Sequence, residues 1–314
     1  MNHVMHIRTG EAAVTLTSPH PQVTDWATRY FGPWWRAAPG RAEHGAVLNV
    51  HIDPEMYRAF SDEVMAQSHT ESEYAKARTF TTDPTAGTVT AVAPSDSLAY
   101  RVGNDAQRLT VVGTDILPAC LAAARIAREA VWGQLLRAGW TLMHASAVAT
   151  EEERALLAFG NKGAGKSTTA LLLARRGGMA LLANDRIFAR ADPDRTTVRI
   201  LPWPAAAALG LGLLDALGLY DVVREHLDAG EQLHPTQHQR VTEALTTNRR
   251  TPLYEDSGRE LKTQLFPDQF PTWFGIPLAT QATAGALLFP HTEPGATPAA
   301  VGTERMPAEA DYFT

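Results

Sequence analysis

One stretch of the sequence has the residue types and spacing of a phosphate-binding loop. It reads G-x-x-x-x-G-K-[ST] in full and consists of Gly160, Asn161, Lys162, Gly163, Ala164, Gly165, Lys166 and Ser167, with Thr168 next. The glycines let the backbone fold around phosphate oxygens, while backbone N–H groups and a helix N-terminus supply positive dipoles. Lys166 adds a charge for the outer phosphates, and the Ser167 hydroxyl can ligate Mg²⁺. The pattern predicts binding of ATP with Mg²⁺.

Two further residues could do chemistry beside this loop. His144 follows a strand-like run before the loop, and Asp185 ends the strand-like run after it. Adjacent strand ends would bring both side chains to the phosphates, where a carboxylate can hold Mg²⁺ or accept a proton from an attacking hydroxyl. The sequence does not show which of these two roles Asp185 has. The structural alternative for Asp185 is a turn cap beside Arg186.

The elements that must position these residues follow in the required order of strand, loop, helix and strand. Apolar runs at 140–149 and 155–159 predict two strands before the loop. Residues 167–176 predict a helix that stops at Gly177-Gly178, and 179–183 predict the next strand. Earlier in the chain, we expect strands at 46–52, 87–93, 97–102 and 108–112, then a helix over 115–139 with a helical apolar spacing.

Composition limits the class of protein. The chain has 314 residues, 45% of them hydrophobic, and a formal net charge of -6, so we do not expect nucleic acid as a partner. The polar N-terminus lacks a signal-peptide core and no apolar run is long enough to cross a membrane, so we expect a cytoplasmic protein. We expect the single cysteine, Cys120, to pack in the core. We expect the same of an aromatic group, for which a ligand-binding wall is the alternative: Trp26, Tyr30, Phe31, Trp34 and Trp35.

The motifs MHASAVA, GNKGAGKSTTALLLARRG and LLANDRIF resemble, in order and spacing, those of the HPr kinase/phosphorylase-like kinases. The likeness is specific over about 142–189. The change from β-like to helical spacing near residue 114 predicts a small β-rich α+β subdomain over 1–114 and a second domain over 115–314. For that second domain the resemblance implies an α/β P-loop kinase domain of the HPr kinase/phosphoenolpyruvate carboxykinase-like type. It further implies an active-site role for His144, a nucleotide loop at 160–168 and a metal-binding or base role for Asp185. A homo-oligomer is compatible with the family.

The sequence departs from the family pattern at two places. Asn184 stands where the family has the first acid of an Asp-Asp pair, and an amide can orient a hydroxyl but cannot take its proton. We therefore assign the base role to Asp185. The loop continues Lys-Ser-Thr-Thr where the HPr enzymes have Lys-Ser-Glu, so the resemblance is closer to divergent members of bacterial specialised metabolism, including kinases that phosphorylate a serine of lasso peptide precursors.

The phosphoryl acceptor is the least defined part of the prediction. We expect a hydroxyl-bearing peptide or small molecule, with Arg249, Arg250, Arg259 and Lys262 as candidate acceptor-binding cations and His234 and His238 beside them. A solvated polar face is the alternative for these residues. Two other functions remain open, namely an ATP-hydrolysing regulatory module that phosphorylates no acceptor, and an HPr-type protein kinase/phosphorylase.

Overall fold

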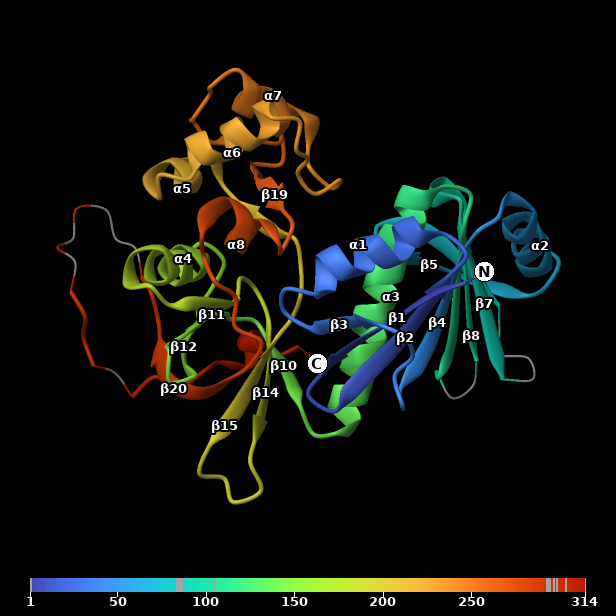
Figure 1. Cartoon of the computed structure of the whole chain (residues 1–314), viewed down its shortest axis with the longest axis horizontal. Coiled ribbons are helices and arrows are strands. Elements are labelled where there is room, and N and C mark those ends of the chain that lie inside the picture. The colour runs from blue at the N-terminus through green and yellow to red at the C-terminus, as the bar shows by residue number, and fades with distance from the viewer. Residues whose placement is uncertain are drawn as a thin grey trace. The chain divides into compact units, whose positions relative to one another are not determined.

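The computed structural model describes residues 2–82, 87–103, 106–291, 295, 297, 299–302 and 304–313. It is a mixed α/β structure with eight α-helices, a nine-stranded sheet and a seven-stranded sheet among these residues. The chain divides into two compact units, Met1–Ala138 and Gly139–Thr314 (Figure 1). None of the described helices is both long and apolar enough to cross a membrane.

The first unit is built on the nine-stranded sheet, in the order β3-β1-β2-β4-β9-β8-β7-β6-β5. Two of its strand pairs, β2–β4 and β4–β9, are parallel and the other pairs are antiparallel. Its strands are β1 His3–Thr9, β2 Ala12–Ser18, β3 Arg36–Pro39, β4 Ala46–Ile52, β5 His69–Tyr74, β6 Ala77–Thr82, β7 Thr88–Ala93, β8 Leu98–Gly103 and β9 Arg108–Gly113. The strands expected at 46–52, 87–93, 97–102 and 108–112 are confirmed as β4, β7, β8 and β9.

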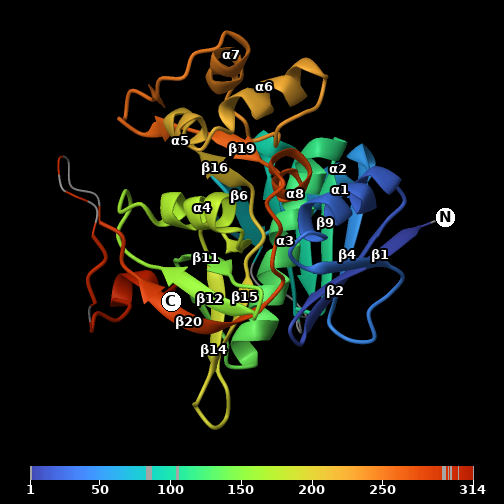
Figure 2. The same ribbon diagram turned by 60° about the vertical axis from the view of Figure 1, so that its left-hand side comes forward.

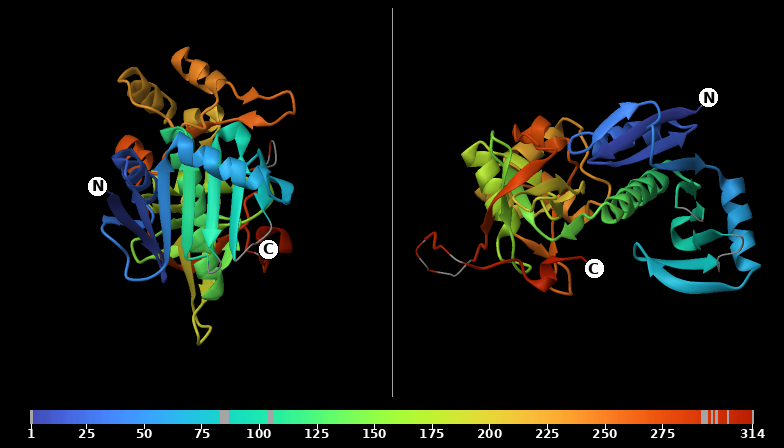
Figure 3. Two further views of the ribbon diagram at one scale, coloured as in Figure 1. Left: turned by 90° about the vertical axis from the view of Figure 1, so that its right-hand side faces the viewer. Right: turned by 90° about the horizontal axis from the view of Figure 1, so that it is seen from below.

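Helices cover both faces of this sheet. They are α1 Pro21–Phe31, α2 Pro54–Met65 and α3 Ile116–Arg137, with a 3-10 turn at Pro94–Asp96. Helix α2 packs over Val92, Ala99 and Val112. Helix α3 packs on β2, β4, β8 and β9 and against α1 (Figure 3). On β9 it lies over Gly113, where an added Cβ would stand 3.0 Å from that of Ala119. Alternate residues of a strand face opposite sides, so α2 and α3 lie on opposite faces.

Helix α3 belongs to the first unit, because it packs on these strands through small side chains such as Ala119, Ala123 and Ala127, all buried. The two units therefore divide after residue 138, whereas the sequence pattern predicts a boundary between residues 114 and 115. Cys120 on this helix is 2% exposed, and burial raises the pKa of its thiol to about 12. Of the aromatic group, Tyr30, Phe31, Trp34 and Trp35 are buried, as the packing interpretation predicts, while Trp26 is half-buried.

The second unit carries the phosphate-loop motif on the seven-stranded sheet, in the order β10-β14-β15-β20-β12-β11-β13 (Figure 2). Its strands are β10 Thr141–Met143, β11 Ser146–Ala149, β12 Arg154–Ala158, β13 Ala180–Ala183, β14 Ile187–Ala191, β15 Val198–Pro202 and β20 Ala282–Leu288. Helix α4, Lys166–Gly177, packs on β11, β12 and β13. The expected helix at 167–176 and the strands at 155–159 and 179–183 are confirmed as α4, β12 and β13.

The rest of this unit is a group of short helices and two small sheets, coloured from yellow to orange-red in Figure 1. It comprises β16 Ala207–Leu209, α5 Leu211–Ala216, α6 Tyr220–Asp228, α7 Gln239–Thr246, β17 Leu253–Tyr254, β18 Glu260–Leu261, β19 Thr263–Leu265 and α8 Gln269–Phe274. The polar stretch 225–250 contains the end of α6 and all of α7. Their apolar residues, including Val223, Val241 and Leu245, are buried and supply the packing that a short polar helix lacks alone.

Candidate functional site

The phosphate-loop motif connects β12 to α4. Gly160, Gly163 and Gly165 have φ values of +133°, +87° and +99°, which side-chain-bearing residues rarely adopt. At Gly160 an added Cβ would also lie 3.2 Å from that of Ala164. The sequence therefore needs glycine here for the loop to close, and the closed loop leads directly into the N-terminus of α4, where backbone N–H groups favour an anion.

Lys166 is the buried cation of this loop. Its side chain belongs to a residue only 8% exposed, and Nζ donates hydrogen bonds to the carbonyl oxygens of Gly160, at 2.6 Å, and Asn161, at 3.3 Å. Burial lowers the pKa of this ammonium, while the negative charges of Asp185 and Asp311 act in the opposite direction. A phosphate at the loop would add further negative charge and compensate the cost of burying the lysine.

Ser167 is tied to the segment that carries Asp185. Its Oγ donates to the backbone oxygen of Asn184 at 3.2 Å, and it lies 3.4 Å from Oγ of Ser146. Ser146 is fully buried and also donates to the Asn184 oxygen. Sequence reasoning did not single out Ser146. The available signal was a hydroxyl in the otherwise apolar strand SAVA, next to His144.

The His144 and Asp185 segments face each other across an interruption of one antiparallel strand pair. Met143 is opposite Ile187, and Ala147 is opposite Ala183. The two pairs are four residues apart on each strand, and the register shifts by one residue after Ala147, where Val148 is opposite Leu181. Between them the ladder opens, and the side chains of the open stretch are free to point toward the loop. The run 140–149, expected as one strand, is divided here into β10 and β11.

The open stretch holds a small charged cluster. Asp185 Oδ1 lies 3.1 Å from Nε2 of His144, and Asp185 Oδ2 lies 3.3 Å from Nε of Arg186. The side chains of Asp185, His144 and Arg186 are 46%, 40% and 37% exposed, so solvent and ligands reach the cluster. The structure thus brings together His144 and Asp185, the two residues that the sequence placed beside the loop.

The charge state of Asp185 follows from these neighbours. Burial would raise the pKa of its carboxyl group, but the hydrogen bond from His144 and the charges of His144, Arg186 and Lys166 together hold the pKa below its usual 3.8. Asp185 is therefore ionised at neutral pH. An ionised carboxylate can accept a proton from a hydroxyl or coordinate a cation, but the carboxylate alone does not distinguish the two.

Asn184 contributes a buried amide oxygen. Its Oδ1 is shielded from solvent and makes no hydrogen bond within the described part of the chain. Leaving such an acceptor unpaired costs about 1–3 kcal/mol, so a ligand donor or a cation would stabilise it. Together with Ser167 and Asp185 it forms a set of oxygen donors of the kind that Mg²⁺ takes when nucleotide phosphates supply its other ligands. The described residues contain no group of three His, Cys, Asp or Glu side chains arranged around one metal position.

Comparison with known proteins adds no family to this description. No protein-family model and no curated protein sequence matches the chain.

The candidate acceptor-binding cations are all in the group of short helices and small sheets. Arg250 pairs with Asp215 and Asp221, both at 2.6 Å, and its guanidinium lies 4.5 Å from the ring centroid of Tyr220. Arg259 pairs with Glu255 at 2.9 Å, and Lys262 with Glu260 at 3.8 Å. Arg249 lines a cavity of about 240 Å³ with Arg240, Glu243, Ala244, Thr247 and Leu253. Arg249 Nε donates to Oγ1 of Thr251 at 3.2 Å. The acceptor role of these four residues stays a prediction.

The two histidines near these cations have local contacts. His234 is 3% exposed, its Nδ1 lies 2.8 Å from Oγ1 of Thr236, and its ring packs against Phe266. Nδ1 of His238 accepts a hydrogen bond from the backbone of Arg240 and caps the N-terminus of α7. The contacts of His238 are those of a helix cap.

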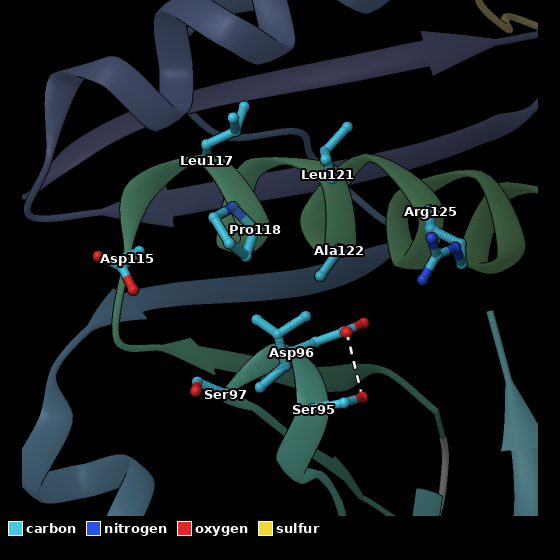
Figure 4. Close-up of a pocket in the computed structure, with 10 residues that line it drawn as sticks. Ser95, Asp96, Ser97, Asp115, Leu117, Pro118, Leu121, Ala122 and Arg125 are labelled. Atoms are coloured by element: carbon cyan, nitrogen blue, oxygen red, sulfur yellow. Dashed lines mark hydrogen bonds between the residues drawn. The ribbon is translucent and has the colours of Figure 1, made fainter. Parts of the chain in front are cut away.

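The first unit contains a cavity of its own, of about 480 Å³, between the start of α3 and the turn from β7 to β8 (Figure 4). Its lining is half apolar and half polar, and Arg125 lies at the end opposite Asp115 in the view. The lining residues are Ser95, Asp96, Ser97, Leu98, Asp115, Leu117, Pro118, Leu121, Ala122 and Arg125. No sequence motif pointed to this cavity.

Proposed function

We propose that the protein is an ATP-dependent kinase that transfers the γ-phosphoryl group to a hydroxyl of a peptide or small molecule. The observation that carries the proposal is that the phosphate loop and the His144–Asp185 pair meet at the same interrupted strand pair. The loop residue Ser167 is bonded to the Asn184 backbone, and the next residue, Asp185, is paired with His144. A nucleotide-binding loop and an ionised proton acceptor side by side are the parts that phosphoryl transfer requires.

Each residue has a chemical task in this proposal. The loop N–H groups and Lys166 bind the phosphates and neutralise charge that develops on the transferring group. The hydroxyl oxygen of the acceptor attacks the γ-phosphorus, the bond to the β–γ bridging oxygen breaks, and ADP leaves. Asp185 accepts the hydroxyl proton, and His144 orients the Asp185 carboxylate through the Nε2–Oδ1 contact. Ser167 and Asn184 Oδ1 would hold Mg²⁺, which would supply electrostatic stabilisation of the phosphates.

The likeness of the motifs to HPr-kinase-like kinases supports the same proposal, and it favours a serine-like hydroxyl. The decisive experiment is mass spectrometry of the purified protein incubated with ATP, Mg²⁺ and a panel of hydroxyl-bearing metabolites and peptides. We expect one acceptor class to gain a single phosphate while ADP appears in equal amount. Lys166→Ala in the same panel is the control for contaminating kinases.

A second function is favoured by Asn184. Since an amide replaces one acid of the family pair, a protein that binds and hydrolyses ATP in order to control a partner is the alternative. It would form ADP and inorganic phosphate, with no phosphorylated product from any member of the panel. That result would replace the kinase proposal with the regulatory one.

A further inference from the structure

Residues far from the motifs in sequence lie along β10, the strand that ends just before His144. Tyr312 forms an antiparallel bridge with Met143. The backbone N–H of His144 donates to the oxygen of Asp311 at 2.7 Å, and the N–H of Phe313 donates to the oxygen of Leu142 at 3.0 Å. Strand β10 is at one end of the seven-stranded sheet, so this segment pairs with its outer edge. The pairing fixes the backbone of 311–313 beside His144.

The ring of Phe313 contacts two members of the charged cluster. It stacks on the imidazole of His144, with centroids 5.9 Å apart and planes 7° from parallel. The guanidinium carbon of Arg186 lies 4.5 Å from the centroid of the same ring, within the range of a cation–π contact. One aromatic side chain therefore restrains the two groups that are paired with the two oxygens of Asp185.

The neighbouring Asp311 is held firmly in place. It is 6% exposed, its backbone oxygen accepts from His144, and its Oδ2 accepts from the backbone of Ala308 at 2.9 Å. Tyr312, between the two, has a side chain that is 43% exposed. Because side chains alternate along an extended segment, Phe313 is directed to the cluster while Tyr312 is directed away from it.

We propose that Phe313 is a positioning residue of the phosphoryl-transfer site, holding the His144 imidazole and the Arg186 guanidinium against Asp185. The catalytic part of this inference rests on the proposed kinase function. Without the ring, His144 loses its stacking partner, and Arg186 keeps the longer contact with the ring of Trp203, at 5.7 Å, so both side chains gain rotamers that turn away from the carboxylate. The proton acceptor then loses its fixed orientation, and a misplacement of about 1 Å at such a site can cost about 10²-fold in rate.

The test compares Phe313→Leu with Tyr312→Leu, which removes an aromatic ring from the same segment but not from the cluster. For Phe313→Leu we expect a fall of kcat of about tenfold or more with little change in the KM for ATP. Phe313→Tyr, which keeps the ring, should retain the rate. Tyr312→Leu should behave as the unchanged protein. Equal losses in Phe313→Leu and Tyr312→Leu, or no loss in either, would overturn the inference.

A second readout does not depend on any activity. A phenyl ring stacked on an imidazole shifts the imidazole proton resonances upfield, so the His144 signals, assigned with His144→Gln, should move downfield in Phe313→Leu and stay in Tyr312→Leu. Phe313→Met, closer in volume, serves if the leucine variant unfolds. Unmoved His144 signals would refute the positioning role. If the His144 signals move but the protein shows no transferase activity, the contact between Phe313 and His144 is supported and the proposed kinase function is refuted.

Discussion

Replacement of Asp185 by asparagine separates chemistry from folding and from nucleotide binding. The carboxylate lies 3.1 Å from His144 Nε2 and 3.3 Å from Arg186 Nε, and all three side chains are more than one-third exposed. Exposed ion pairs contribute about 0.2–1 kcal/mol each, so the free energy of unfolding should fall by at most about 2 kcal/mol. Loss of a general base typically lowers the rate by about 10²–10⁴, which corresponds to about 3–5 kcal/mol in the barrier.

The pH dependence of this stability loss has a definite sign. Neighbouring charges hold the folded-state pKa of Asp185 below 3.8, so its contribution is present at neutral pH and is lost as the pH falls through the folded value. The difference in unfolding free energy between the two proteins should therefore shrink below about pH 4. Urea unfolding at several pH values measures this difference.

The assay for Asp185→Asn pairs the rate of phosphorylated product with calorimetric ATP affinity. We expect a large loss of rate and an ATP affinity that changes only slightly. Asp194→Asn is the matched control, because Asp194 also has a lowered pKa, from hydrogen bonds to Thr196, but is in the turn between β14 and β15. A parallel loss of ATP affinity and rate in Asp185→Asn would indicate a metal ligand instead of a base. An unchanged rate would refute both roles.

Three other variants test the remaining parts of the site. Lys166→Ala should weaken ATP binding by about tenfold or more, measured by calorimetry, since a charge-assisted contact contributes about 1.5–3 kcal/mol. Ser146→Ala should lower the free energy of unfolding by about 0.5–1.5 kcal/mol in urea, because the Asn184 oxygen keeps its bond from Ser167. Arg250→Ala should lower the melting temperature, because the ion pairs with Asp215 and Asp221 are lost, and should leave the KM for the acceptor unchanged. A higher KM with no change in melting temperature would instead assign Arg250 to acceptor binding.

The local part of the site could be predicted from the sequence. A strand, a glycine-rich loop and a helix follow one another within residues 154–177, and each has its own signal in periodicity or in glycine. The proximity of His144 and Asp185 was also predictable, since both residues flank strand-like runs next to the loop.

The rest depends on contacts between distant segments. The strand is interrupted at His144-Ala145 without a glycine or proline in the sequence there. The interruption arises because residues 184–186 of the partner segment do not pair with it. The pairing of 311–313 with β10 has no local signal either, since an edge strand accepts any extended segment of suitable shape. Helices α6 and α7 contain polar sequence that becomes helical only through their buried apolar residues.

Asn184→Asp tests whether the missing family acid belongs to a metal site. The Asn184 oxygen is buried and without a hydrogen bond in the described chain, so a carboxylate there would place unpaired negative charge beside Asp185. That change should destabilise the protein by more than about 1 kcal/mol without ligands. Mg²⁺ with ATP should then raise the melting temperature more than in the unchanged protein, because ligand binding to the folded state adds to stability. An equal rise in both proteins would exclude residue 184 from the metal site. Asn248→Asp adds the same charge at an exposed position and should respond like the unchanged protein, so it controls for the net charge.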